Sequence, residues 1–236
     1  MRLHRDHAHL CESVADALKR RIGEAIDARG TCHMGFAGGQ TPVPLFNLLA
    51  VKYAEKLPWD HIHIYWGDER FVPVEDPESN FGAANRHLVS RIPIPASNVH
   101  PITFDSGDLN QAASRYEDLL LEILGSPPRL DILMLGMGVD GHTASIFHDS
   151  EALTSKHRFV VPVVSPIHPV ERVTLTLSAI NQARHIYFLV VGSGKSEALK
   201  CAFGQLNSID PCPAKFVEPV DGNVIWWVDA EAAEGL

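Results

Sequence analysis

One acid and one imidazole lie two positions apart in a glycine-rich stretch near the middle of the chain. Asp140 and His142 belong to residues 130–147, LDILMLGMGVDGHTASIF. The first six residues are almost all apolar, and glycines then recur at positions 136, 138 and 141. This pattern predicts a buried strand that ends in a sharp loop. Because open α/β sheets bind ligands beyond the carboxyl ends of their strands, Asp140 and His142 are candidates for general acid–base catalysis.

A second glycine-rich turn follows a strand-like segment nearer the amino terminus. Residues 31–37 (TCHMGFA) predict a strand, and the turn after it contains Gly38, Gly39, Gln40 and Thr41. Pro42 suits the first position of a helix, with Thr41 as its N-cap. Main-chain N–H groups and the positive end of the helix dipole converge at such a turn. It is therefore a candidate anion site, although an ordinary βα connection has the same composition.

Charged side chains follow two further strand-like segments. The run HIHIYW at 61–66 precedes Asp68 and Arg70, and the run HIYFLVV at 185–191 precedes Lys195. Functional residues concentrate at such strand ends. Two cations and a glycine turn favour binding of a phosphate monoester, whereas an imidazole with a carboxylate favours acid–base chemistry.

Each of the acids in these segments also has a purely structural alternative. Asp140 is either a carboxylate that orients His142 or only the turn residue that an Asp-Gly step favours. Asp68 is either a catalytic group or a cap for the loop that follows it. The residues alone leave both alternatives open.

Strand-like and helix-like segments alternate along the chain. Helical periodicity covers 6–29, 80–89, 109–124 and 196–203, and strands are expected at 159–164, 172–177 and 223–228, the last before a short acidic helix. A helix is also expected to begin near Thr143 and Ser145, and the irregular segment 91–108 is either a flap over the site or plain surface. The alternation predicts an α/β fold with a mostly parallel, Rossmann-like sheet flanked by helices, as a single domain over residues 1–236.

Composition excludes several classes of protein. The formal net charge is −9 and the 20 basic residues form no long run, which argues against nucleic-acid binding. No apolar stretch approaches the length of a membrane span, and the amino terminus lacks the apolar core of a secretory signal, so we expect a cytoplasmic protein without membrane contact. Four scattered cysteines and 13 histidines show no ligand spacing typical of a metal site, and the dinucleotide fingerprint is missing.

Several segments, in this order, resemble the 6-phosphogluconolactonases, which belong to a superfamily with the glucosamine-6-phosphate isomerases/deaminases. The matching segments are AGGQTP (37–42), WGDERFVP (66–73), SNFG (79–82), LGMGVDGHTASIF (135–147), ERVTLTLSAIN (171–181) and GSGKSEAL (192–199). The segment containing DGHTAS is the most specific of them. Only the first turn departs from the family's usual SGGSTP, because Ala37 and Gln40 stand where the family has serine.

The resemblance implies hydrolysis of 6-phospho-D-glucono-1,5-lactone in the oxidative pentose phosphate pathway, without metal or cofactor. It implies that His142 is the general base that activates water, with Asp140 beside it. It also implies that Arg70, Lys195 and Arg172 contact the phosphate or the carbonyl oxygen, and that residues 38–41 line the same site. Arg172 has the alternative of pairing with a surface acid. The expected partner is a small sugar phosphate, bound by a monomer or a weak homo-oligomer.

Two other functions stay open. The first is an amino-sugar phosphate isomerase/deaminase, whose loop resembles DGHIAFNEP; this chain has DGHTASIFHDS, without the Asn-Glu-Pro. The second is a sugar-phosphate sensor without catalysis, since a fold does not dictate function. Loss of His142 or Lys195 would favour the sensor, and both are present.

Overall fold

The central sheet contains seven strands in the order β1-β10-β9-β6-β2-β3-β5, and every neighbouring pair is parallel. In the computed structural model, which describes residues 1–104, 107–205 and 212–236, these strands are β1 (Arg2–His4), β2 (Cys32–Phe36), β3 (Ile62–Trp66), β5 (Val99–His100), β6 (Ile132–Leu135), β9 (His185–Val190) and β10 (Asn223–Asp229). All four residues of β6 are buried, as expected for a strand covered on both faces. The predicted mostly parallel α/β fold is confirmed.

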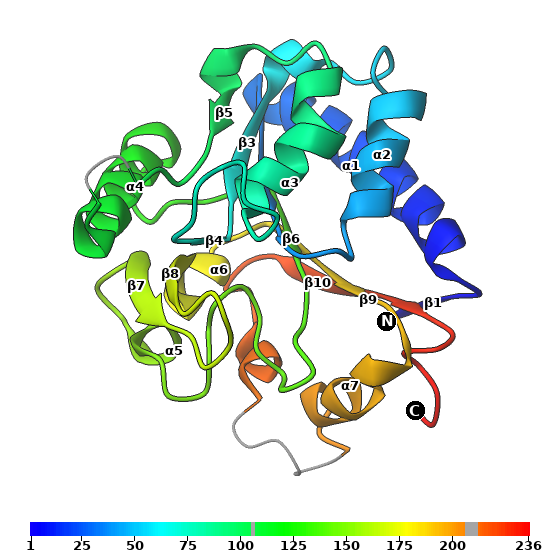
Figure 1. The fold of residues 1–236 in the computed structure, drawn as a ribbon. Helices are drawn as coiled ribbons and strands as arrows, with labels where there is room; N and C mark the ends of the chain where they lie inside the picture. Colours follow the sequence, from blue (N-terminus) through cyan, green and yellow to red (C-terminus); the bar gives the residue numbers. More distant parts are fainter. Residues whose placement is uncertain (105–106, 206–211) are drawn as a thin grey trace.

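Helices cover both faces of this sheet. Figure 1 shows α1, α2 and α3 on one side of it and α7 on the other. The helices are α1 (His7–Arg29), α2 (Val43–Lys52), α3 (Asn80–His87), α4 (Leu109–Leu124), α5 (Glu151–Thr154), α6 (Leu177–Ile180) and α7 (Ser196–Ala202). Short 3-10 turns are η1 (Trp59–His61), η2 (Val89–Arg91), η3 (Ala96–Asn98), η4 (Ser193–Lys195) and η5 (Pro213–Phe216). Within the described residues, no helix combines the length and apolarity needed to cross a membrane.

A second, antiparallel sheet of three strands stands beside the first. Its order is β4 (Asp68–Arg70), β8 (Glu171–Leu175) and β7 (Val160–Val164). The register places Arg70 directly opposite Arg172, which brings two cations from distant segments together. Helix α4 is fixed to β7 by the buried Glu117 carboxylate, which accepts hydrogen bonds from the backbone N–H groups of Phe159 and Val160. The small sheet thus places two arginines near the carboxyl ends of the strands of the large sheet.

Four details of the sequence prediction are wrong. Thr41 does not cap α2, because Pro42 holds the N-cap position without a side-chain hydrogen bond. No helix begins at Thr143 or Ser145; the next helix, α5, begins at Glu151. Residues 230–235 form turns instead of an acidic helix. Segment 91–108 is not simply irregular, because it contains β5 at the sheet edge; its residues 105 and 106 lie outside the described part. The prediction of one domain over 1–236 stays a prediction.

Three histidines from neighbouring strands share one face of the large sheet. His33, His63 and His100 lie on β2, β3 and β5, and His63 Nδ1 is 3.0 Å from His100 Nε2. Tyr65 stacks on His100, with 4.6 Å between ring centroids, and its hydroxyl is 3.0 Å from His33 Nδ1. Burial and, second to it, the positive charge of the neighbouring histidines lower the pKa of His33 and of His100 to about 4. The folded cluster therefore favours neutral rings.

This cluster predicts acid-sensitive stability. Because the unfolded histidines titrate at 6.5 and the folded ones at about 4, the unfolded chain binds more protons, and stability is lost as the pH falls from 6.5 to 4. The double variant His33→Gln/His100→Gln is expected to flatten the decline in Tm over that range. Exposed His157→Gln is the control and should leave the slope unchanged. A double variant with the wild-type slope would contradict the assignment.

Candidate active site

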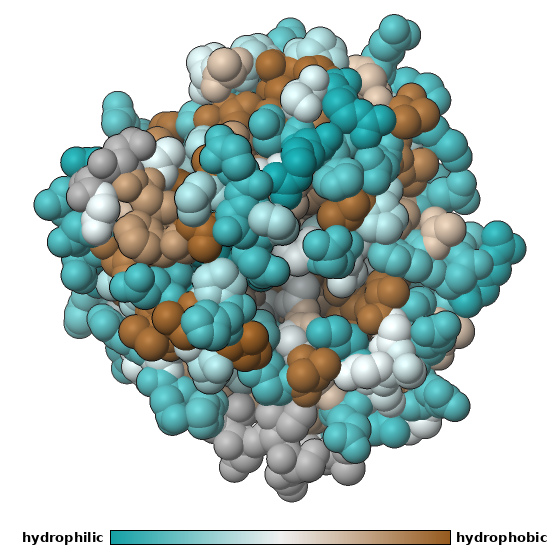
Figure 2. Space-filling view, viewed as in Figure 1, coloured by the Kyte–Doolittle hydropathy of each residue, from teal (hydrophilic) through white to brown (hydrophobic). Residues whose placement is uncertain are grey.

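The site lies between β2 and β6, where the order in which the chain adds strands to the sheet reverses direction. Strands β2 and β6 are neighbours, and the chain continues from β2 toward β3 and β5 but from β6 toward β9 and β10. In open α/β sheets the carboxyl ends of two such strands diverge and leave a crevice for ligands. Residues 38–41 follow β2, and residues 136–142 follow β6, so both glycine-rich loops border this crevice. Figure 2 shows a hollow near the middle of the corresponding face.

A cavity of about 340 Å³ occupies this position. Nine of the predicted site residues line it, which are Gly38, Gly39, Gln40, Thr41, Asp68, Arg70, His142, Arg172 and Lys195. Asp140 does not line it but contacts His142 directly. Five separated segments of the sequence therefore meet in one cavity, and four of them follow strands of the large sheet, as the strand-end argument predicts.

The Asp140 carboxylate and the His142 imidazole form a short hydrogen bond. His142 Nδ1 is 2.5 Å from Asp140 Oδ1. Partial burial raises the pKa of Asp140, but the hydrogen bond to His142 and the charge of His142 outweigh it and lower the pKa overall. An ionised carboxylate only accepts, so Nδ1 carries the proton and the lone pair of the neutral ring is on Nε2. This is the arrangement that a general base requires.

Glycine is required in this loop because the backbone passes close to the pair. A Cβ at position 138 would lie 2.2 Å from His142 Nδ1 and 2.3 Å from Asp140 Oδ1. Gly141, with φ +78°, lies where a Cβ would be 2.6 Å from the Cys212 sulfur. The backbone N–H of Gly138 also donates to the carbonyl oxygen of His142, 2.8 Å away. The glycines therefore let the loop fold tightly around Asp140 and His142.

Asp68 belongs to a buried hydrogen-bond network below the cavity. Its Oδ2 accepts from the Ser145 hydroxyl at 2.6 Å, and its Oδ1 accepts from Asn80 Nδ2 at 3.2 Å. The capping role considered for Asp68 belongs instead to the next residue, Glu69. The Glu69 carboxylate accepts hydrogen bonds from the backbone N–H groups of Asn80 and Phe81 at the start of α3. Burial raises the pKa of Glu69 to about 7 despite these donors. Asp68 thus connects β4, α3 and the loop after His142.

Arg172 is buried, with only 4% of its surface exposed, and it holds the hairpin between β7 and β8. Its Nε donates to the carbonyl oxygen of Pro169 at 2.8 Å, and its Nη2 donates to that of Ile167 at 3.1 Å. Its Nη1 lies 3.4 Å from the Ser145 hydroxyl. Burial lowers the pKa of Arg172. The alternative of a surface ion pair is wrong, because in the described part of the chain these nitrogens bind loop and hydroxyl oxygens.

Two cations that lie far apart in the sequence, Arg70 and Lys195, border the cavity. Arg70 donates through Nη1 to the Glu78 carbonyl oxygen at 2.5 Å and pairs with the Glu78 carboxylate at 3.2 Å. Burial lowers the pKa of Lys195, and the negative charge of Asp140 opposes that shift. With Arg172 they make the cavity locally positive in a chain whose net charge is −9. In the described residues, no group of three or more His, Cys, Asp or Glu is placed to hold a metal ion.

Several residues of the candidate site were not identified from the sequence as site residues. Asn80 and Ala144 line the cavity, and Ser145 supports it from below. Ala144, two residues after His142 and directly before Ser145, has φ +48°, an uncommon conformation for alanine. Asn80 and Ser145 stand within the family-like segments SNFG and DGHTAS, but nothing in either segment reveals that both side chains bind Asp68.

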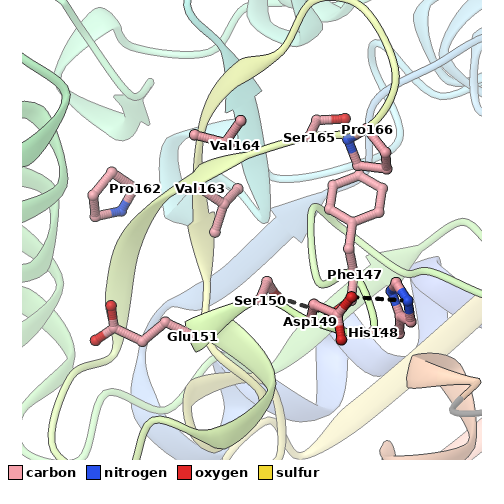
Figure 3. Close-up of a pocket in the computed structure, with 10 residues that line it drawn as sticks. All are labelled: Phe147, His148, Asp149, Ser150, Glu151, Pro162, Val163, Val164, Ser165 and Pro166. Carbon is pink, nitrogen blue, oxygen red and sulfur yellow. Dashed lines mark hydrogen bonds and ion pairs between the residues drawn. The ribbon is translucent and has the colours of Figure 1, made fainter.

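A second cavity, of about 430 Å³, adjoins the loop that carries His142 (Figure 3). Phe147 lines it, and the Phe147 ring also lies 4.7 Å from the His142 ring. The other lining residues come from segments 148–151 and 162–166, and none of them is a predicted site residue. Figure 3 shows the Phe147 ring pointing toward Pro166 on the far wall. His142 and the three cations thus line the first cavity and not the second.

A family model described as glucosamine-6-phosphate isomerases/6-phosphogluconolactonase matches residues 5–226. The chain belongs to this family. It is 38% identical over 231 residues to a 6-phosphogluconolactonase of Synechocystis sp., covering 96% of this chain and 94% of that relative. The family thus spans nearly the whole chain.

Solved structures of the family share the fold. A 6-phosphogluconolactonase from Trypanosoma cruzi superposes with a TM-score of 0.88 at 30% identity, covering 99% of this chain and 95% of that one. A monomeric glucosamine-6-phosphate deaminase superposes with a TM-score of 0.83 at 21% identity, covering 98% of both chains. The second likeness shows the shared fold alone.

Proposed function

We propose that the protein hydrolyses 6-phospho-D-glucono-1,5-lactone to 6-phospho-D-gluconate. The observation that carries this proposal is the His142–Asp140 pair at a cavity that also holds Arg70 and Lys195. Relatives named 6-phosphogluconolactonase over nearly the full length support the choice of substrate. A base at one position and cations at another suit a lactone that carries a phosphate.

The chemistry follows from the tautomer of His142. Nε2 takes a proton from a water molecule as the water oxygen bonds to the lactone carbonyl carbon, which becomes a tetrahedral oxyanion. When the oxyanion collapses, the bond from this carbon to the ring oxygen breaks, and the imidazolium returns the proton to that leaving oxygen. Asp140 holds the ring through Nδ1 and stabilises the imidazolium. Water is consumed, and His142 ends in its starting state.

The phosphate supplies binding energy away from the reacting carbon. Lys195, Arg70 and the N–H groups of residues 38–41 are the groups that we assign to it. Anchoring the phosphate orients the lactone ring against His142, so binding energy is converted into positioning. Gln40 replaces the family's usual serine here, and its carboxamide can also donate a hydrogen bond.

The isomerase/deaminase alternative has less support. The loop after His142 lacks the Asn-Glu-Pro of that branch, and the next glutamate, Glu151, lines the second cavity instead of the first. The non-catalytic sensor is disfavoured because the base and its carboxylate are in hydrogen-bond contact. A cytoplasmic location, the absence of a cofactor and a monomer or weak homo-oligomer stay predictions.

A coupled assay tests the proposal. Glucose 6-phosphate and its dehydrogenase generate the lactone in situ, and its decay is followed with and without purified protein in the presence of EDTA. Decay faster than the spontaneous rate is the expected result. If the protein leaves the spontaneous rate unchanged, the lactonase proposal is wrong, and release of ammonia from glucosamine 6-phosphate is the next measurement.

Loss of the lysine at the cavity should weaken substrate binding more than turnover. Lys195→Ala is expected to raise KM about 10- to 100-fold, the range for a charge-assisted hydrogen bond, and to lower kcat by a smaller factor. Exposed Lys19→Ala is the matched control and should keep wild-type constants. Steady-state kinetics on the lactone separates the two parameters. An unchanged KM would remove Lys195 from the phosphate site.

A further inference from the structure

Asn80, the first residue of α3, has a side chain with a fixed orientation at the cavity. The residue is 2% exposed, and its Nδ2 donates to the backbone oxygen of Asp68 at 2.9 Å and to the Asp68 carboxylate at 3.2 Å. Both partners can only accept, so the reversed amide would place an oxygen against two oxygens. The network therefore fixes Nδ2 toward Asp68 and leaves Oδ1 on the opposite side of the carboxamide.

The Oδ1 atom of Asn80 is a buried acceptor with no hydrogen-bond partner among the described residues. It lies next to the glycine turn, because a Cβ built on Gly38 would be 1.8 Å from it. Asn80 and Gly38 both line the candidate active-site cavity. Buried polar atoms in folded proteins are nearly always paired, so an unpaired acceptor at a ligand cavity indicates a donor on the ligand.

We propose that Asn80 Oδ1 accepts a hydrogen bond from a ring hydroxyl of the substrate. This inference rests on the proposed function, because it takes the ligand to be a phosphorylated sugar lactone. The phosphate of such a ligand is mainly dianionic at neutral pH and offers acceptors only, and so does the lactone carbonyl. The hydroxyl groups are the donors that the sugar itself presents. Asn80 therefore binds the polyol part of the ligand.

Asn80 then acts as a specificity determinant. A site built to accept a substrate hydroxyl disfavours the analogue that lacks it, because the buried acceptor stays unpaired in the complex. Wild-type protein is expected to prefer 6-phosphogluconolactone over one of its 2-, 3- or 4-deoxy analogues by about 10- to 100-fold in kcat/KM, the usual cost of one unpaired buried acceptor. The backbone and carboxylate contacts of Nδ2 do not involve the ligand, so they do not contribute to this preference.

The experiment compares these four lactones with wild-type protein and with Asn80→Ala. Asn80→Ala is expected to reduce the preference for the hydroxylated substrate to about threefold or less. The control is Ser79→Ala, which alters the neighbouring residue at the same helix start, where Ser79 bonds to Glu69 and Gly82 but does not line the cavity. It should retain the full preference. Circular dichroism shows whether each variant is folded.

Gly38→Ala provides a second variant in case Asn80→Ala does not fold. Its methyl group would lie 1.8 Å from Oδ1 and 2.0 Å from Cγ of Asn80, so it displaces the carboxamide while the asparagine itself is kept, and the same preference should fall. Unchanged preferences in both variants, or an equal loss on all four lactones, would overturn the proposal; an equal loss would indicate that the acceptor serves the attacking water. Failure of wild-type protein to hydrolyse any lactone would instead overturn the proposed function. Calorimetric titration with 6-phosphogluconate and its deoxy analogues measures the same preference without turnover.

Discussion

His142→Ala is expected to lower kcat for the lactone by about 10²- to 10⁴-fold, the usual contribution of a positioned general base. Binding of 6-phospho-D-gluconate should stay within about threefold of the wild-type affinity, because the phosphate contacts are made by other residues. The reason is the geometry of the pair: Asp140 holds Nδ1 at 2.5 Å, so Nε2 is the only ring nitrogen that can take a proton from water. Alanine removes that acceptor and leaves the cations in place.

Two measurements separate this loss from damage to the fold. Initial rates are corrected for spontaneous lactone hydrolysis, and product affinity is measured by titration calorimetry. His148→Ala is the matched control, since His148 lies on the same loop but is exposed, pairs with Asp149 and lines the second cavity. It should retain wild-type turnover. A His142→Ala protein that keeps the wild-type kcat would show that another group activates the water.

Much of the fold could be predicted because several elements have strong apolar patterns. Helix α4 occupies 109–124 as predicted, and β6 follows from its unbroken apolar run. The rule that ligands bind at the carboxyl ends of parallel strands then placed Asp140, His142 and Lys195 at one edge without any contact information. The topology confirms this reasoning, since β2 and β6 are neighbours at the reversal of strand order.

The remaining features depend on contacts that no local pattern encodes. Strands β1, β4 and β5 have three residues or fewer, which is too short for an alternating pattern to appear. The capping of α3 by Glu69 joins β4 to residues 80 and 81, and the Ser145–Asp68 bond joins residues 77 positions apart. Thr143 and Ser145 resembled helix caps because hydroxyls favour that position, but their hydroxyls instead bind Gly136 and Asp68.

Arg172→Leu is expected to lower the free energy of unfolding by about 2–4 kcal/mol, a large effect for one residue. Arg172 lies opposite Arg70 in the small sheet, and it ties the β7–β8 hairpin to the site through the carbonyl oxygens of Pro169 and Ile167. Leucine leaves these two acceptors and the Ser145 hydroxyl without their donor, and it removes a positive charge near the buried Asp68. Denaturant unfolding of the variant measures the loss.

Arg172→Lys distinguishes the charge from the shape of the guanidinium. Lysine keeps the positive charge but presents a single ammonium group, which cannot reach three oxygens in the directions that Nε, Nη1 and Nη2 reach now. If the guanidinium fork fixes the hairpin, the lysine variant should recover less than half of the stability lost in Arg172→Leu. Exposed Arg115→Leu, the control for loss of an arginine, should change the free energy of unfolding by no more than about 0.5 kcal/mol. Full recovery by lysine would mean that the charge near Asp68, and not the hold on the hairpin, is what the fold requires of this residue.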